Sequence, residues 1–171
     1  MDSLFESLIE IIRRTSAEIP DDVQRAILAA LENEKQDTIA KSAMEIIERN
    51  IALAKEKSQP LCQDTGSVLF YVECPVGYDQ MEFADAARGA VTEATKRGFL
   101  RQNSVDSLTG KNDGTNIGPG APTFHFHQTR ETNVTVRLVL KGGGCEIVGA
   151  QFSQPNTKLN ANRDLDGCRK V

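Results

Sequence analysis

The chain has 171 residues, of which 39% are hydrophobic and 26% charged, and its net charge is −4. That length predicts a single domain, residues 1–171, and no apolar run approaches the roughly 20 residues that a membrane span needs. With acids and bases interspersed, no tryptophan and two tyrosines, the chain has neither the basic surface nor the stacking aromatics of a nucleic-acid-binding protein.

Three amphipathic helices are predicted in the first third of the chain. Ser3 followed by Glu6 fits a capping box for the first helix, Pro20 ends it, Asp21 can cap the second, and the third begins near Asp37. We expect their apolar stripes to face a core, as scaffold helices do. These stripes are Leu4, Leu8, Ile11 and Ile12, then Val23, Ile27, Ala30 and Leu31, then Ile39, Ala43, Ile46, Ile47 and Ala54.

A strand and a further helix follow Pro60. Residues 67–73 alternate between apolar and other side chains, as a half-buried strand does, with Val68, Phe70 and Val72 facing inward. Asp79 then starts a helix, and Gly98 stands where a C-cap glycine belongs. The inward residues of this helix are Phe83, Ala86, Ala87, Ala90, Val91 and Ala94.

Residues 102–122 are rich in glycine, asparagine, aspartate and proline. A loop of this length inside a compact domain is typically functional or disordered, and we favour a functional loop. Two strands follow, residues 123–128 and 134–140, which we predict to form an antiparallel hairpin. KGGGCE, residues 141–146, interrupts them, and Asp164 can cap a short last helix. The pattern predicts a mixed α/β fold in which an N-terminal helical group packs with a small, mainly antiparallel sheet.

The cysteines Cys62, Cys74, Cys145 and Cys168 show no Cys-x-x-Cys spacing. The first residues, MDSLFESLIEIIRR, lack the order of a secretory signal, so we expect a reducing, cytoplasmic location and no disulfides. Cys62 stands apart because it lies in a polar loop, PLCQDTGS at residues 60–67, whereas structural cysteines usually lie in apolar elements. Its chemistry alone fits either a plain loop cysteine or a metal ligand.

The order of the motifs decides between these two interpretations. PLCQDTG, an alanine-rich helix ending in RGFLRQN, a loop rich in glycine and asparagine, and KGGGCE follow one another along the chain. This arrangement, over residues 35–171, resembles the N-terminal domain of class I, iron-sulfur-dependent fumarate hydratases and the alpha subunits of L-tartrate dehydratases. CQDTG is the most specific of the motifs.

The resemblance implies a role for each residue of CQDTG. Cys62 would be one of three thiolates that hold a 4Fe-4S cluster, whose fourth iron acts as a Lewis acid on a dicarboxylate substrate. Gln63 would hydrogen-bond the substrate, and Asp64 would serve as the catalytic general acid or base. Without the resemblance, an Asx-turn is the simpler interpretation of Asp64.

Two substrate contacts are implied elsewhere in the chain. Arg101, in the FLRQN segment, resembles the family arginine that grips a substrate carboxylate, and a guanidinium suits that geometry. Gly144, in the triple glycine, would contact a substrate carboxylate through its backbone. Taken alone, Arg101 also fits a helix-end arginine, and Gly144 fits a turn that ends a strand.

The remaining chemistry-bearing residues give weaker indications. His125 and His127 lie two apart on a predicted strand and so share a face, which suits two metal ligands, but a site needs three or four and ordinary sheet-face histidines are the simpler interpretation. Cys145 follows the triple glycine, and its position does not match a cluster ligand of the family. Cys74 and Cys168 fit structural roles.

The resemblance also implies parts that lie beyond these residues. The family's other two cluster cysteines, and the base that exchanges the carbon-bound proton, belong to a C-terminal domain or a beta subunit. We therefore expect a truncated N-terminal domain that holds no complete cluster and has no activity alone, and whose parent protein forms homo- or hetero-oligomers.

The parent protein is expected to be a hydro-lyase that reversibly hydrates fumarate to malate, a step of the tricarboxylic acid cycle. An alternative is the alpha subunit of an L-tartrate or other dicarboxylate dehydratase. Alternatives of a different class are a non-catalytic interaction domain and a thiol redox sensor that uses Cys62, which would require an unusually acidic thiol.

Overall fold

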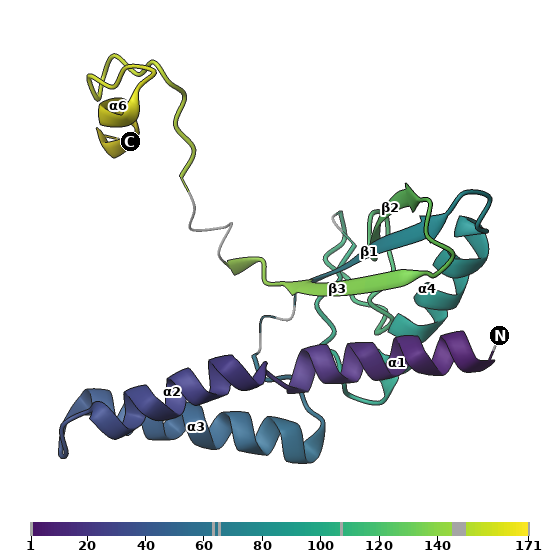
Figure 1. Ribbon diagram of the computed structural model, residues 1–171, viewed down its shortest axis with the longest axis horizontal. Helices are drawn as coiled ribbons and strands as arrows, with labels where there is room; N and C mark the ends of the chain where they lie inside the picture. The colour runs from purple at the N-terminus through teal and green to yellow at the C-terminus, as the bar shows by residue number, and fades with distance from the viewer. Residues whose placement is uncertain (1, 63, 65, 107, 145–149, 171) are drawn as a thin grey trace.

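The computed structural model describes residues 2–62, 64, 66–106, 108–144 and 150–170 (Figure 1). Its helices are α1 (Asp2–Ala17), α2 (Asp21–Asn33), α3 (Ile39–Lys57), α4 (Gln80–Lys96) and α6 (Leu165–Lys170), and its strands are β1 (Ser67–Pro75), β2 (Thr123–Thr129) and β3 (Thr135–Lys141). The mixed α/β class is confirmed. In the described part of the chain, no helix combines the length and the apolar character that crossing a membrane requires.

The three strands form one mixed sheet in the order β2-β1-β3. β1 pairs parallel with β2 and antiparallel with β3, so the predicted hairpin of the last two strands is wrong. Residues 130–134 carry no Asn-Gly or Asp-Gly signal for a tight hairpin turn. Five residues can also reach across two strand spacings, which are about 4.8 Å each. The apolar strand β1 can therefore lie between β2 and β3 and form a ladder on both of its edges.

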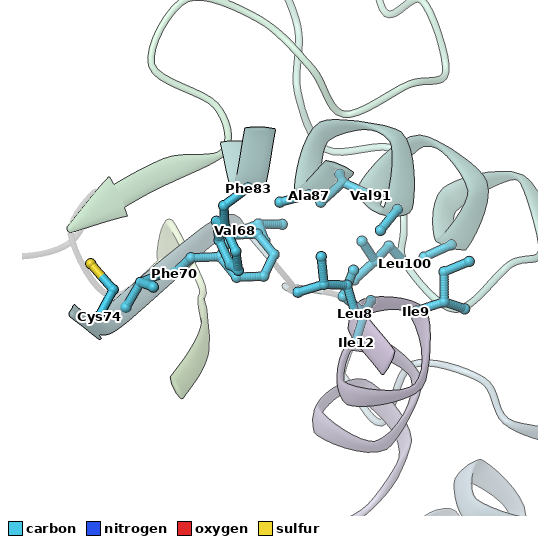
Figure 2. Close-up of a cluster of buried hydrophobic side chains, with 13 residues drawn as sticks. Leu8, Ile9, Ile12, Val68, Phe70, Cys74, Phe83, Ala87, Val91 and Leu100 are labelled. Carbon is cyan, nitrogen blue, oxygen red and sulfur yellow. The ribbon is translucent and has the colours of Figure 1, made fainter. Parts of the chain in front are cut away.

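One face of the sheet is covered by α4 and α1, and the core lies where these two helices and the sheet meet. Figure 2 shows side chains of α1, β1 and α4 pointing toward one another in this core. Phe70 on β1 packs edge-on against Phe83 on α4, with ring centroids 6.2 Å apart. The buried cluster comprises Leu8, Ile9, Ile12, Val68, Phe70, Val72, Cys74, Phe83, Ala87, Ala90, Val91, Ala94 and Leu100.

Capping residues set the ends of α3 and α4. The Asp79 carboxylate accepts hydrogen bonds from the amides of Met81 and Glu82, and Gly98 has a φ of +79° just beyond the helix, so both predicted ends of α4 are confirmed. Thr38 caps α3 by accepting a hydrogen bond from the Lys41 amide, and the helix begins at Ile39, near Asp37 as predicted.

The first two helices begin differently from the prediction. α1 already includes Asp2, so Ser3 lies inside the helix instead of capping it. At α2 the N-cap position falls on Pro20, which has no capping side chain, and Asp21 lies in the first turn.

The apolar stripes of the second and third helices do not reach the core. None of the described residues of α2 is buried, and on α3 only Ile51 and Ala54 are. α2 packs on α3 instead, and Figure 1 shows the pair extending away from the sheet. Periodicity therefore predicted these helices correctly, but of the three N-terminal helices α1 supplies the main contact with α4 and the sheet.

We expect Phe83→Ala to lower the free energy of unfolding by about 3–5 kcal/mol, because it removes a ring at the centre of the core. Phe152→Ala is the matched control, since Phe152 is 51% exposed and surface changes typically cost less than about 0.5 kcal/mol. Urea unfolding of both variants, followed by circular dichroism, measures the difference. Equal losses would contradict this account of the core.

Candidate active site

Two loops meet at one end of the sheet. The CQDTG loop, residues 62–66, precedes β1, and the triple-glycine segment, residues 142–144, follows β3. Ser67 pairs with Lys141 in the antiparallel register, so the start of β1 lies beside the end of β3. Two segments almost 80 residues apart in sequence are therefore neighbours in space.

The Asp64 carboxylate joins the two loops. Its Oδ1 accepts a hydrogen bond from the Gly143 amide at 3.0 Å, and its Oδ2 accepts one from the Gly144 amide at 2.8 Å. Two consecutive backbone amides that point at one anion bind both of its oxygens and hold it in one orientation. Asp64 is thus fixed by the neighbouring segment rather than by an Asx-turn of its own loop.

Glycine is required at this junction for lack of space. Gly66 has a φ of +55°, and a Cβ there would overlap the carbonyl of Lys141. A Cβ on Gly142 would lie 2.6 Å from Asp64 Oδ2, and one on Gly144 would lie 2.9 Å from the same atom. Gly142 and Gly144 therefore let the backbone approach the carboxylate closely, whereas a Cβ on Gly143 would meet no atom within 4 Å.

Cys62 is exposed, and its sulfur accepts a hydrogen bond from the Asp64 amide at 3.4 Å. The preceding residue is held on both sides, since the Leu61 amide donates to the Ser16 carbonyl and the Leu61 carbonyl accepts from the Asn50 side chain. An accessible sulfur on an anchored loop, with an amide donor, has the chemistry of a thiolate ligand to an iron-sulfur cluster. Gln63 lies outside the described residues.

The described residues supply no second cysteine beside Cys62. Cys74 is buried in the core and Cys168 lies in α6, which Figure 1 shows well apart from the sheet. Among the residues with described positions, no three His, Cys, Asp or Glu side chains gather as a metal site. Cys62 therefore fits a cluster as a single ligand.

Arg101 follows Leu100, which is buried in the core, and its own side chain is exposed. Its carbonyl accepts hydrogen bonds from the Asn116 side chain at 2.6 Å and from the Asn103 amide at 3.0 Å. Within the described part of the chain no hydrogen bond or ion pair joins Arg101 to Asp64 or Gly144. The structure thus brings together Cys62, Asp64 and Gly144, while the Arg101 side chain is exposed.

Comparison with known proteins identifies the family of the chain. Residues 5–171 match the family described as fumarate hydratase (Fumerase). The chain belongs to this family. It is 45% identical, over 99% of its length, to a Geobacillus stearothermophilus protein assigned as a class I fumarate hydratase, and covers 34% of that protein.

More distant relatives are alpha subunits of L(+)-tartrate dehydratase. A Methanocaldococcus jannaschii protein so assigned is 28% identical over 84% of this chain, and the Escherichia coli K12 subunit is 27% identical over 87%. The chain spans about half the length of these two relatives, 52% and 50% respectively.

In this fumarate hydratase family member, the long loop between α4 and β2 is built from local turns. Asp106 accepts hydrogen bonds from the Thr109 amide and hydroxyl, which lower its pKa, and Asp113 accepts from the Thr115 hydroxyl and amide with the same effect. Because both pKa values are lowered, the carboxylates are charged at neutral pH, and their hydrogen bonds weaken as the pH falls through the lowered values.

The histidine pair lies on the open face of the sheet. His125 stacks on Tyr71 with ring centroids 4.6 Å apart, and His127 pairs in register with Glu73. Both histidines are exposed and project from one face, as predicted. Cys145 lies outside the described residues.

The sequence prediction missed Asn116, a buried loop residue, and the way in which Asp64 is held. The triple glycine was expected to approach an anion, and in the structure the anion that it contacts is Asp64. Three hollows on the described surface, with volumes of about 860, 630 and 730 Å³, are lined by residues other than Cys62, Asp64 and Gly144.

We expect Asp64→Ala to accelerate hydrogen exchange of the Gly143 and Gly144 amides by about 10-fold or more, because each loses a charge-assisted hydrogen bond. Amide exchange measured by NMR on the isotopically labelled chain tests this. Asp85→Ala is the control, since Asp85 is an exposed, ion-paired aspartate on α4. Unchanged exchange at both glycines in Asp64→Ala would contradict the proposed contact.

Proposed function

We propose that this chain is the N-terminal part of an iron-sulfur hydro-lyase that reversibly hydrates fumarate to malate. The observation that carries the proposal is the junction of Cys62 and Asp64, in which an accessible sulfur and a rigidly held carboxylate share one short loop. The 45% identity to a protein assigned as a class I fumarate hydratase supports the substrate.

Cys62 would be one ligand of a 4Fe-4S cluster. When bound, such a cluster with one iron open to substrate supplies a Lewis acid that polarises the substrate's hydroxyl and carboxylate. The hydrogen bond from the Asp64 amide to the Cys62 sulfur supports this role, because amide donors stabilise a ligating thiolate.

Asp64 would transfer the proton as general acid or base. The Gly143 and Gly144 amides each donate to one of its oxygens, and each oxygen keeps a lone pair for substrate. The carboxylate therefore does not need to reorganise before it accepts or donates a proton. Gly144 can donate to a substrate carboxylate only if Asp64 shares or releases its amide.

Arg101 would bind a substrate carboxylate through its exposed guanidinium, and Gln63 would hydrogen-bond the substrate. The remaining cluster ligands and the base for the carbon-bound proton would come from a C-terminal domain or a beta subunit, in a cytoplasmic homo- or hetero-oligomer. That the chain spans 34% of its Geobacillus relative supports this division.

We expect Cys62→Ser to abolish the cluster of the whole enzyme. Removing a residue that merely hydrogen-bonds a metal ligand typically lowers metal affinity or activity by about 10- to 100-fold. Loss of a ligating thiolate should therefore lower activity by at least that much. Anaerobic reconstitution, visible absorbance and malate dehydration measure the effect. Cys168→Ser is the control and should retain both cluster and activity.

The isolated chain, reconstituted in the same way, should hold no stoichiometric cluster. A stable cluster with turnover in the chain alone, or full activity in Cys62→Ser, would refute the assignment.

The second candidate substrate is L-tartrate, which the similarity to tartrate dehydratase alpha subunits favours. We expect the whole enzyme to dehydrate malate with a kcat/KM at least about 10-fold above that for tartrate, since a site that hydrogen-bonds one hydroxyl pattern discriminates against another. Parallel assays with both acids test this, and a preference for tartrate would assign the chain to the dehydratase branch.

A further inference from the structure

Asn116 is a buried residue within a loop whose other described residues are mostly exposed. The residue is 4% exposed, and its backbone has a φ of +57°, in the left-handed region that asparagine tolerates better than most residues. Burying an amide costs free energy unless its hydrogen bonds are satisfied. The partners of Asn116 therefore indicate what the residue does.

The side-chain amide uses its full hydrogen-bonding capacity on two segments of the chain, residues 101–104 and the end of α4. Its Oδ1 accepts from the backbone amides of Asn103 at 2.9 Å and Ser104 at 3.1 Å. Its Nδ2 donates to the carbonyl of Arg101 at 2.6 Å and to the hydroxyl of Thr95 at 3.0 Å. The two N–H partners require an oxygen and the two oxygen partners require an N–H group, so the orientation of the amide is determined.

The contact to Thr95 ties this network to a rigid element. Thr95 is buried on the inner face of α4, and its hydroxyl donates to the Val91 carbonyl at 2.7 Å. Asn116 therefore links the last turns of α4 to residues 101–104, a stretch outside the helices and strands. A single side chain here supplies bonds that a helix or sheet would supply elsewhere.

Arg101 lies between two fixed points. On one side Leu100 is buried in the core, and on the other the Arg101 carbonyl is held by Asn116. Fixing both neighbours of a Cα restricts the backbone dihedrals and so the direction in which the side chain leaves the chain. The exposed guanidinium is thus carried on a backbone that cannot turn freely.

We infer that Asn116 is a positioning residue that aims Arg101 at a substrate carboxylate. The inference rests on the proposed function, in which Arg101 binds that carboxylate. Asn116 acts on Arg101 through the hydrogen bond that its side chain donates to the Arg101 carbonyl. Its contribution is to reduce the orientational freedom that binding would otherwise remove.

Two substitutions distinguish a positioning role of Asn116 from a contribution to fold stability alone. Asn116→Gly keeps the left-handed backbone and removes the amide, whereas Asn116→Asp keeps the shape and the two accepted bonds but loses the donors to Arg101 and Thr95. Asn160→Gly is the matched control, because Asn160 has a φ of +51° and is exposed. Melting of each variant reports on folding.

The test uses the whole enzyme that carries this chain, with its cluster reconstituted. We expect Asn116→Asp and Asn116→Gly to lower kcat/KM for malate by about 10- to 100-fold, chiefly through KM, because a small misplacement of a binding group costs this much. In an Arg101→Ala background the same changes should have no further effect on KM, since both act through one contact.

Each outcome bears on one of the two hypotheses. A fall in kcat or melting temperature with KM unchanged makes Asn116 merely structural and overturns the inference, as does an equal rise in KM with and without Arg101. If Arg101→Ala leaves KM unchanged, the proposed role of Arg101 is refuted, and the inference about Asn116 that rests on it is refuted too. If Arg101→Ala raises KM while both Asn116 variants leave it unchanged, the inference fails and the proposed function stands.

Discussion

The antiparallel pairing of β1 with β3 is the constraint on which the candidate site depends. Its register sets Ser67 opposite Lys141 and so brings the CQDTG loop beside the triple-glycine segment. A slip of one residue would turn Val68, Phe70 and Val72 away from α4 and toward solvent. The same burial that stabilises the domain therefore fixes the register, and the register brings Asp64 to the amides of Gly143 and Gly144.

The two candidate site residues, Asp64 and Arg101, are held in different ways, but both by hydrogen bonds to backbone groups. Asp64 is held directly, since backbone amides bind its carboxylate, while Arg101 is held through its own carbonyl by the buried Asn116 amide. Both arrangements use backbone groups that lie outside the hydrogen-bond ladders of the sheet. Such groups must find partners when they are removed from water. The loops thus gain order from the bonds that also orient the chemistry.

Local patterns predicted the elements that depend on local forces. The alternation in β1, the Asp79 cap and Gly98 each express a preference of a few neighbouring residues, and the structure confirms them. The pairing of β2 and β3 with β1, and the absence of buried residues on α2, are long-range outcomes that periodicity does not encode. The motifs likewise indicated Asp64 and Gly144 as residues, but not their contact. Asn116 was missed because an asparagine in a glycine-rich loop is typical of a turn.

The Gly144 amide donates to Asp64, and in the proposed site it would also serve a substrate carboxylate. One N–H group donates most strongly to one acceptor at a time, and here that acceptor is Asp64 Oδ2. A substrate carboxylate that took the same donor would leave Asp64 with the Gly143 amide alone and would lie close to a second negative charge. The position of Asp64 and the binding of a dicarboxylate at this point are therefore coupled. A guanidinium that neutralised the arriving carboxylate would reduce this repulsion, and Arg101 would then have a second role beside the one proposed for it.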